Sequence, residues 1–226
     1  MASSGAYAFS LENAEIIAEA FERMEIDPST LQHRHLTSAL RSLGLMFGEW
    51  SGEGVNQWRI DQETKTLTDG DYTFALPAGT IDVLGAWLRR SSVDTAMNMI
   101  SRQDWHDIPT KTTEGRPDRF WVEKLTTLTP TFYHWPAAEN STDVIVYTRL
   151  LQMEDAGTLA QTPALPARWL EAICAGLAAK LAVKYAMKKL GALKPLADEA
   201  FMKARRGDRE LGPTTIQVPR LGRRRF

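Results

Sequence analysis

The chain has 226 residues, of which 43% are hydrophobic and 24% charged, so it has room for a sizeable core and the composition of a soluble globular protein. Its formal charge of -1 is unevenly distributed. From Lys203 to Phe226 eight basic residues stand against two acidic ones, a net charge of +6, which leaves -7 on residues 1–202. This asymmetry favours self-association or a charged partner over a small-molecule enzyme.

The cysteine and hydropathy patterns exclude further classes of protein. Cys174 is the only cysteine, which excludes an internal disulfide framework and a thiolate metal cluster and suits synthesis in a reducing cytoplasm. The N-terminal stretch has no basic residue ahead of an apolar run, so we expect no secretory signal. The longest uncharged stretch of the most apolar predicted helix, Ala172–Ala179, is far shorter than the ~20 residues that span a bilayer, so we expect no membrane partner.

Residues 1–54 predict two helices. Ser10 is a candidate N-cap, and apolar residues spaced three and four apart follow it. Asp27-Pro28 favours a second helix start, and the apolar stripe of that helix ends before the Ser51–Gly54 turn. Two helices joined by a short connection predict an antiparallel helical hairpin.

Residues 55–158 change to the period-two pattern of strands. Apolar and smaller residues alternate from Tyr72 to Leu76, and the nearly all-apolar sequence IDVLGAWLRR at 81–90 predicts a buried strand. Further short strands with short turns predict an antiparallel β domain. Within this domain, segment 101–119 is polar and too long for a tight hairpin, so we expect it to form a protruding loop.

Helical patterns return in residues 159–210. Trp169, Ile173 and Leu177 begin an apolar stripe, and many alanines beside it allow close helix packing. We expect these C-terminal helices to pack on the N-terminal hairpin. The predicted fold class is therefore α+β: a helical bundle from both ends of the chain, an inserted antiparallel β domain, and an extended basic arm at 211–226.

The sequence offers little for catalysis. His33 and His35 are two residues apart, which places them on different faces of a helix rather than at the spacing of a zinc site. Asp104 and His106 have no partnered nucleophile, and Cys174 lies on an apolar helical face. No phosphate-binding loop or dinucleotide fingerprint is present. We therefore expect no catalytic, cofactor-binding or metal site, and no enzyme.

Several short motifs appear in a characteristic order between Leu11 and Tyr185. The helical hairpin is followed by Phe-Ala-Leu-Pro at 74–77, IDVLGAWLRR, Ile-Pro-x-Lys at 108–111, Gly-Arg-Pro at 115–117, Trp135-Pro136, VYTRLLQMEDAG and LPARWLEAICAGLAAKLAVKY. In this order the chain resembles the head-to-tail adaptor proteins of tailed bacteriophages, of the podovirus tail tubular protein A type. The family has Tyr two residues before Leu-Pro, where this chain has Phe74.

The resemblance implies a structural virion protein at the head-tail junction. Such a protein forms a ring, usually dodecameric, beneath the portal vertex, where it extends the DNA channel and carries a tail nozzle or stopper protein. Its partners would be the portal protein, that tail component, further copies of itself, and passing double-stranded DNA without sequence specificity. A heterologous ring interface would suit the acidic and basic surfaces of one chain.

Three surfaces are expected to make these contacts. The ring-building body would pair an acidic face with a basic one, either within the protomer or across to its neighbour: Glu15, Glu19 and Glu22 with Lys180, Lys184 or Lys188. The loop 101–119 would face the next tail component through Asp104, Trp105, Lys111 and Arg116. The C-terminal arm would bind the portal through Ile216, Val218, Arg220, Leu221, Arg223, Arg224, Arg225 and Phe226.

Two other functions compete with this reading. In the first, the chain binds nucleic acid and the arginine-rich tail contacts phosphates with salt-sensitive, sequence-independent affinity. In the second, which has less support, an enzyme works through Asp104, His106 and Lys111. Electron microscopy would separate them, because rings indicate an adaptor and duplex-coated filaments indicate a nucleic-acid-binding protein.

Overall fold

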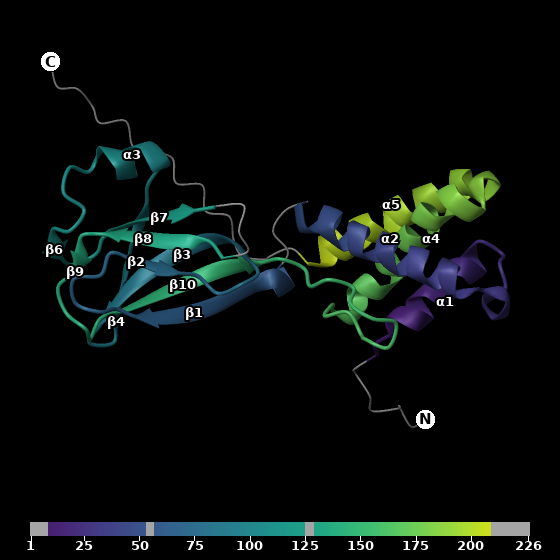
Figure 1. Ribbon diagram of the computed structural model, residues 1–226, viewed down its shortest axis with the longest axis horizontal. Helices are drawn as coiled ribbons and strands as arrows, with labels where there is room; N and C mark the ends of the chain where they lie inside the picture. The colour runs from purple at the N-terminus through teal and green to yellow at the C-terminus, as the bar shows by residue number, and fades with distance from the viewer. Residues whose placement is uncertain (1–8, 53–56, 125–128, 209–226) are drawn as a thin grey trace, which may run out of the picture.

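The computed structural model describes residues 9–52, 57–124 and 129–208. Figure 1 shows two parts side by side, one built of strands and the other of helices. The helical part combines segments from both ends of the chain, and the strands come from the middle. The predicted α+β class is thus confirmed.

The two N-terminal helices do not begin at the residues predicted from the sequence, Ser10 and Asp27. Helix α1 spans Asn13–Arg23, and its N-cap is Glu12, not Ser10. Glu12 and Glu15 form a reciprocal capping box, which satisfies two otherwise free backbone donors. Asp27 caps only the short 3-10 turn η1 (Pro28–Thr30), and helix α2 then runs over His33–Gly52.

Helix α4 (Leu170–Tyr185) is the central helix of this part, because it contacts α1, α2 and α5 (Leu190–Gly207). It follows the 3-10 turn η3 (Ala167–Trp169), and a second turn, η4 (Met187–Lys189), joins it to α5. Buried residues surround α4 on most of its circumference, so its sequence is apolar rather than amphipathic.

The β part contains two four-stranded sheets. The first has the order β1-β10-β3-β4 and the second the order β2-β8-β7-β5, with a small β6–β9 pair beside them. Antiparallel pairing dominates, but β5–β7 and β6–β9 are parallel. The strands are β1 (Ile60–Thr66), β2 (Thr73–Ala75), β3 (Thr80–Arg90), β4 (Val93–Ala96), β5 (Asn98–Met99), β6 (Glu114–Gly115), β7 (Arg119–Glu123), β8 (Thr131–Trp135), β9 (Ala137–Ala138) and β10 (Val144–Leu151).

Each part has its own hydrophobic core. The helical core gathers side chains such as Phe21, Leu43, Trp169 and Leu177. The β core lies between the faces of the two sheets and includes Leu88, Phe120, Phe132 and Ile145. The two sets of buried residues have no member in common, so each part buries apolar surface independently.

Polar contacts join the two parts. Arg59, which directly precedes β1 and is 1% exposed, donates from Nε to the Leu151 carbonyl at 2.8 Å and from Nη2 to the Ser51 carbonyl at 3.2 Å. The backbone N–H of Met153 donates to Ser51 Oγ at 3.1 Å. These bonds hold the end of α2 against the neighbouring ends of β1 and β10.

The segment 101–119 is not a simple loop. It contains a short helix, α3 (Arg102–Asp107), and strand β6, and it is drawn over the second sheet in Figure 1. Ser101 and Asp104 form a capping box at the start of α3, and Trp105 is 2% exposed. The burial of this one large aromatic side chain explains why a polar segment is ordered. Within the described ranges, no helix is both long and apolar enough to cross a membrane.

Candidate functional site

The acidic residues expected at a ring interface belong to α1. Glu19 Oε1 accepts from Arg23 Nε at 2.8 Å, and Arg23 also donates to both carboxylate oxygens of Glu171 at 2.8 and 2.7 Å. These hydrogen bonds from Arg23 hold the pKa of Glu171 below its usual range. Glu15 accepts from the backbone N–H of Glu12 in the capping box, and Glu22 is exposed.

The structure does not bring these acids to the lysines within one protomer. Lys180 forms an ion pair with Glu49 of α2. Lys184 donates to Ser42 Oγ at 2.7 Å and to Ser38 Oγ at 3.2 Å, and both serines belong to α2. Of the two alternatives, a contact within the protomer or one with its neighbour, the structure does not show the first: two of the lysines face α2, whereas the acids lie where α1 meets α4. Lys188 belongs to η4 and is exposed.

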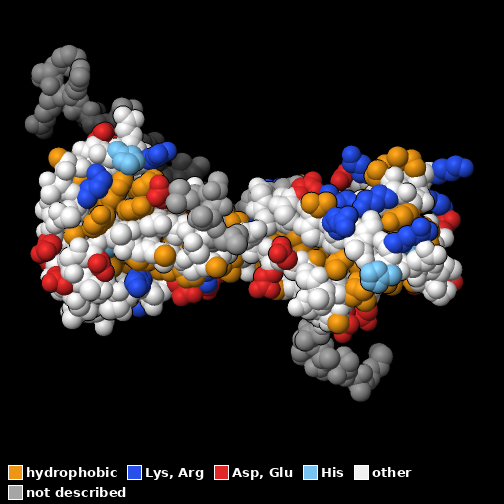
Figure 2. All heavy atoms as spheres, in the orientation of Figure 1, with side chains coloured by type: hydrophobic (Ala, Val, Ile, Leu, Met, Phe, Trp, Pro, Cys, Tyr) orange, Lys and Arg blue, Asp and Glu red, His pale blue; other side chains and the backbone are white. Residues whose placement is uncertain are grey.

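The helical part thus has differently charged surfaces. In Figure 2 basic side chains gather over α2, and acidic ones are visible at the lower edge, where Figure 1 draws α1. Apolar side chains are also exposed on this part, including Leu45 at 68% and Met187 at 61%. Both charged and apolar side chains are therefore available on this surface for contacts with other proteins.

The residues expected to face a tail component have mostly structural roles. Asp104 accepts from the Ser101 hydroxyl at 2.7 Å and from its backbone N–H, and these bonds keep the pKa of Asp104 below its usual range. Trp105 is buried against Trp121 and Tyr133, so it cannot contact a partner directly and this expectation was wrong. Its burial against neighbouring rings explains the difference.

Lys111 also supports the segment from within. Its Nζ lies 5.4 Å from the centre of the Trp105 ring and donates to the Ile108 carbonyl at 2.9 Å. Arg116 is exposed and donates to the Thr95 hydroxyl of β4 at 2.6 Å. Of the four residues named from the sequence, Asp104 and Arg116 therefore remain at the surface.

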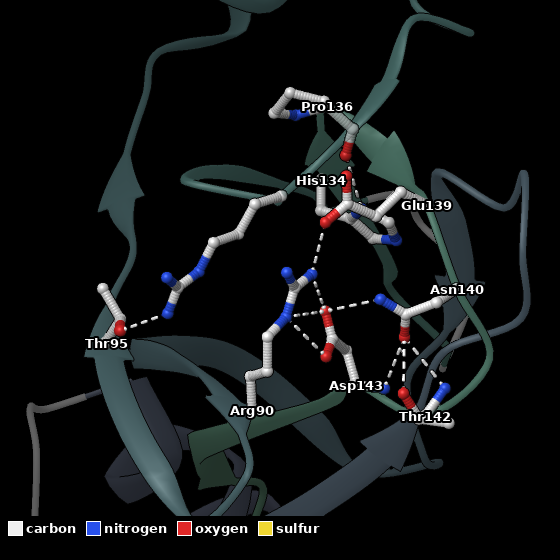
Figure 3. Close-up of polar contacts among 9 residues, drawn as sticks. Arg90, Thr95, His134, Pro136, Glu139, Asn140, Thr142 and Asp143 are labelled. Carbon is white, nitrogen blue, oxygen red and sulfur yellow. Dashed lines mark hydrogen bonds and ion pairs between the residues drawn. The ribbon is translucent and has the colours of Figure 1, made fainter.

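Figure 3 shows a polar network that the sequence analysis missed. Arg90 at the end of β3 donates from Nε to the two oxygens of Asp143 at 2.9 and 3.0 Å, and from Nη2 to Glu139 at 2.6 Å. Asp143 is 2% exposed and accepts a further bond from Asn140 Nδ2 at 3.3 Å. The only sequence signal was an Asn-Ser-Thr-Asp turn before a strand, which does not identify an arginine 53 residues away.

His134 lies behind this network and is fully buried. Its Nδ1 lies 3.1 Å from the Pro136 carbonyl, and since a carbonyl can only accept, Nδ1 carries the proton. Nε2 has no hydrogen-bond partner in the described structure. Burial lowers the pKa of His134, so the ring is neutral at pH 7.

The remaining candidates give no catalytic constellation. His33 and His35 stand in the first turn of α2, where His35 Nδ1 accepts from the backbone N–H of Gln32 at 3.2 Å. Burial raises the pKa of the Cys174 thiol to about 11, so it is protonated at neutral pH and a poor nucleophile. Among the described residues, no three His, Cys, Asp or Glu side chains are grouped to hold a metal ion.

The expected portal-binding arm lies outside the described residues. This applies to all of its named members: Ile216, Val218, Arg220, Leu221, Arg223, Arg224, Arg225 and Phe226.

The described chain is thus a two-part α+β protein with acidic and basic surfaces on its helical part. The SU10 adaptor protein family matches residues 14–219, nearly the whole chain, and the chain belongs to that family. It is thus a phage adaptor-type structural protein, a class that is generally not enzymatic, belongs to the virion and interacts with portal and tail components. No curated protein matches the chain.

Proposed function

We propose that this adaptor forms a ring, with twelve copies as the expected number, beneath the portal vertex at the head-tail junction. The ring would extend the DNA channel, pass double-stranded DNA without reading its sequence, and carry a tail nozzle or stopper protein in the manner of podovirus tail tubular proteins. The main support is the family match, and the charged surfaces of the helical part agree with it.

The ring contact is proposed to be heterologous. Lys180 and Lys184 face α2, whereas Glu15, Glu19 and Glu22 lie along α1, so one copy can present acids to the lysines of the next. The charges would guide assembly over a Debye length of about 8 Å, and the exposed apolar side chains would retain it.

Electron microscopy of the purified protein, alone and with its portal, tests this function. We expect closed rings, or rings that cap the portal, for the wild-type protein. Reversal of Glu15, Glu19 and Glu22 to lysine should reduce ring formation at low salt. Duplex-coated filaments in the presence of DNA, without rings, would instead indicate a nucleic-acid-binding protein.

The arm at 211–226 is proposed to bind the portal. Its β-branched TTIQV sequence can add as a strand to a sheet edge, and its arginines can pair with portal carboxylates. Many copies in one ring would make the attachment strong through avidity. Truncation after Leu211 should give a folded protein that no longer binds the portal, and normal portal binding by this variant would disprove the role of the arm.

The exposed surface of segment 101–119 is proposed to face the next tail component. Arg116 is the member best placed for this contact, since Trp105 and Lys111 are occupied within the protomer. An Arg116→Glu variant should keep portal binding and lose tail recruitment. Loss of portal binding with tail recruitment retained would reverse the assignment.

A further inference from the structure

A groove runs along the surface where α1 meets the start of α4. Its apolar lining includes Leu11, Ala18 and Leu170, and its volume of about 560 Å³ can hold a short peptide segment. Phe9, which is 68% exposed, stands beside these apolar residues. We call this groove the acidic groove, after the glutamates that line it, and nothing in the described part of the chain fills it.

The charge of the acidic groove specifies its occupant. Glu15, Glu19, Glu22 and Glu171 line it, against the single guanidinium of Arg23. Arg23 is already shared between Glu19 and Glu171, and no side-chain cation pairs with Glu15 or Glu22 among the described residues. An occupant should therefore carry several positive charges together with apolar side chains.

The end of the described chain lies close to this groove. Asp208, which follows α5, is 4% exposed and forms an ion pair with Arg168 of η3. Arg168 is the sequence neighbour of Ala167 and close to Leu170, and both of these line the groove. The described chain therefore ends close to the groove, and a segment of 18 residues, the length of 209–226, can span up to roughly 60 Å.

The composition of this terminal segment matches the groove. Residues 209–226 contain five arginines and one acid, a net charge of +4. The segment also contains the apolar residues Ile216, Val218, Leu221 and Phe226. Such a segment combines the positive charge and the apolar side chains that the acidic groove requires.

We propose that in the free protein residues 216–226 bind in the acidic groove of their own chain. Apolar side chains of the segment cover Leu11, Ala18 and Leu170, and its arginines pair with Glu15 and Glu22. The proposal concerns the free protein and does not depend on the proposed portal contact. Where both hold, the portal competes with the groove for the same segment, so the arm is covered until the partner arrives.

Photo-cross-linking of the full chain tests this proposal. Phe226 is replaced by p-benzoyl-L-phenylalanine, the dilute protein is irradiated, and the cross-linked peptides are identified by mass spectrometry. We expect cross-links within one chain to residues 9–23 or 167–174, in a yield that is independent of protein concentration and falls with added salt. No portal is present, so the result is independent of the portal experiment, and a yield that does not change with concentration separates it from contacts between copies.

Charge variants make the test specific. Glu15→Lys with Glu22→Lys should lower the cross-link yield about fivefold or more at low salt. Glu49→Lys with Asp198→Lys, in the separate groove between α2, α4 and α5, is the matched control and should not change it. If the lysine variant fails to fold by circular dichroism, Glu15→Gln with Glu22→Gln serves in its place. Cross-links elsewhere, none at all, or only between two chains would overturn the proposal.

Discussion

Two adjacent arginines of β3 have very different surroundings. Arg89 pairs with Asp94, and both side chains are about two-fifths exposed. Arg90 instead pairs with Asp143, whose side chain is 3% exposed, and with Glu139. A surface pair contributes little to stability, whereas a buried carboxylate that loses its cation is left with an unpaired charge.

Arg90→Ala should therefore destabilise the protein several times more than Arg89→Ala. The free energy of unfolding, measured by urea denaturation, checks this prediction. Equal losses for the two variants would show that the Arg90 network is no more than a surface ion pair.

The buried ring of His134 predicts a dependence of stability on pH. Since burial lowers its pKa in the folded state, the unfolded chain binds a proton near pH 6.5 that the folded chain does not. The resulting contribution to stability is complete above about pH 6.5 and is lost as the pH falls towards the lowered pKa. Between about pH 7 and pH 5 the unfolding midpoint should therefore fall less in His134→Gln than in the wild type. The control variant His33→Gln, at an exposed position, should show the same decrease of the midpoint with pH as the wild type.

At the scale of elements, glycine marks the contact between α2 and α4. A Cβ at Gly176 would lie 2.9 Å from Met46 Sδ, closer than packed atoms tolerate, and 3.4 Å from Trp50 Cζ2. A Cβ at Gly48 on exposed α2 surface would meet nothing within 4 Å. The first glycine allows two helices to approach, and the second only weakens its own helix.

These two glycines predict opposite effects of substitution. Gly176→Val should destabilise the protein by about 1–3 kcal/mol because it overpacks the α2–α4 contact. Gly48→Ala should stabilise it by up to about 1 kcal/mol through helix propensity alone. Thermal melts followed at 222 nm measure both, and a neutral Gly176→Val would show that Met46 moves aside without cost.

The elements that the sequence predicted are those with a long regular pattern. The apolar stripes of α1 and α2 and the long apolar sequences of α4 and β3 extend over many residues, so local sequence is enough to identify these elements. Helix α3 was not predicted, because its six residues include only one apolar side chain, Trp105. The burial of Trp105 depends on aromatic partners in other segments of the chain. The parallel β5–β7 pairing likewise depends on contacts between separate segments.

The candidate sites were less predictable than the fold. Acidic and basic residues could be assigned to surfaces, but their pairing could not, and Lys180 binds Glu49 rather than an acid of α1. Ion pairs form between residues far apart in the chain, and composition does not determine which surfaces meet. The Arg90 network could not be predicted for the same reason, since Arg90 and Asp143 are 53 residues apart in the chain.

At the scale of the whole molecule, the two separate cores predict separable stability. Phe132 and Leu177 are both fully buried, Phe132 in the β core and Leu177 in the helical core. We expect Phe132→Ala to lower the free energy of unfolding by about 3–5 kcal/mol and Leu177→Ala by about 2–5 kcal/mol. Hydrogen exchange should rise in the β sheets for Phe132→Ala and in α1, α2 and α4 for Leu177→Ala. Increased exchange throughout the chain in either variant would show that the two parts unfold as one unit.

The junction between the parts also determines how the molecule resists pulling. β1 begins directly after Arg59 and pairs with β10, which ends at Leu151, so both connections to the helices leave the same end of one sheet. Tension between the two parts therefore acts along the strands, and it loads the β10–β3 ladder in shear. In shear the hydrogen bonds of a ladder share the load, whereas in peeling they break one after another. The sheet is thus oriented to withstand a mechanical force directed from one part of the molecule to the other.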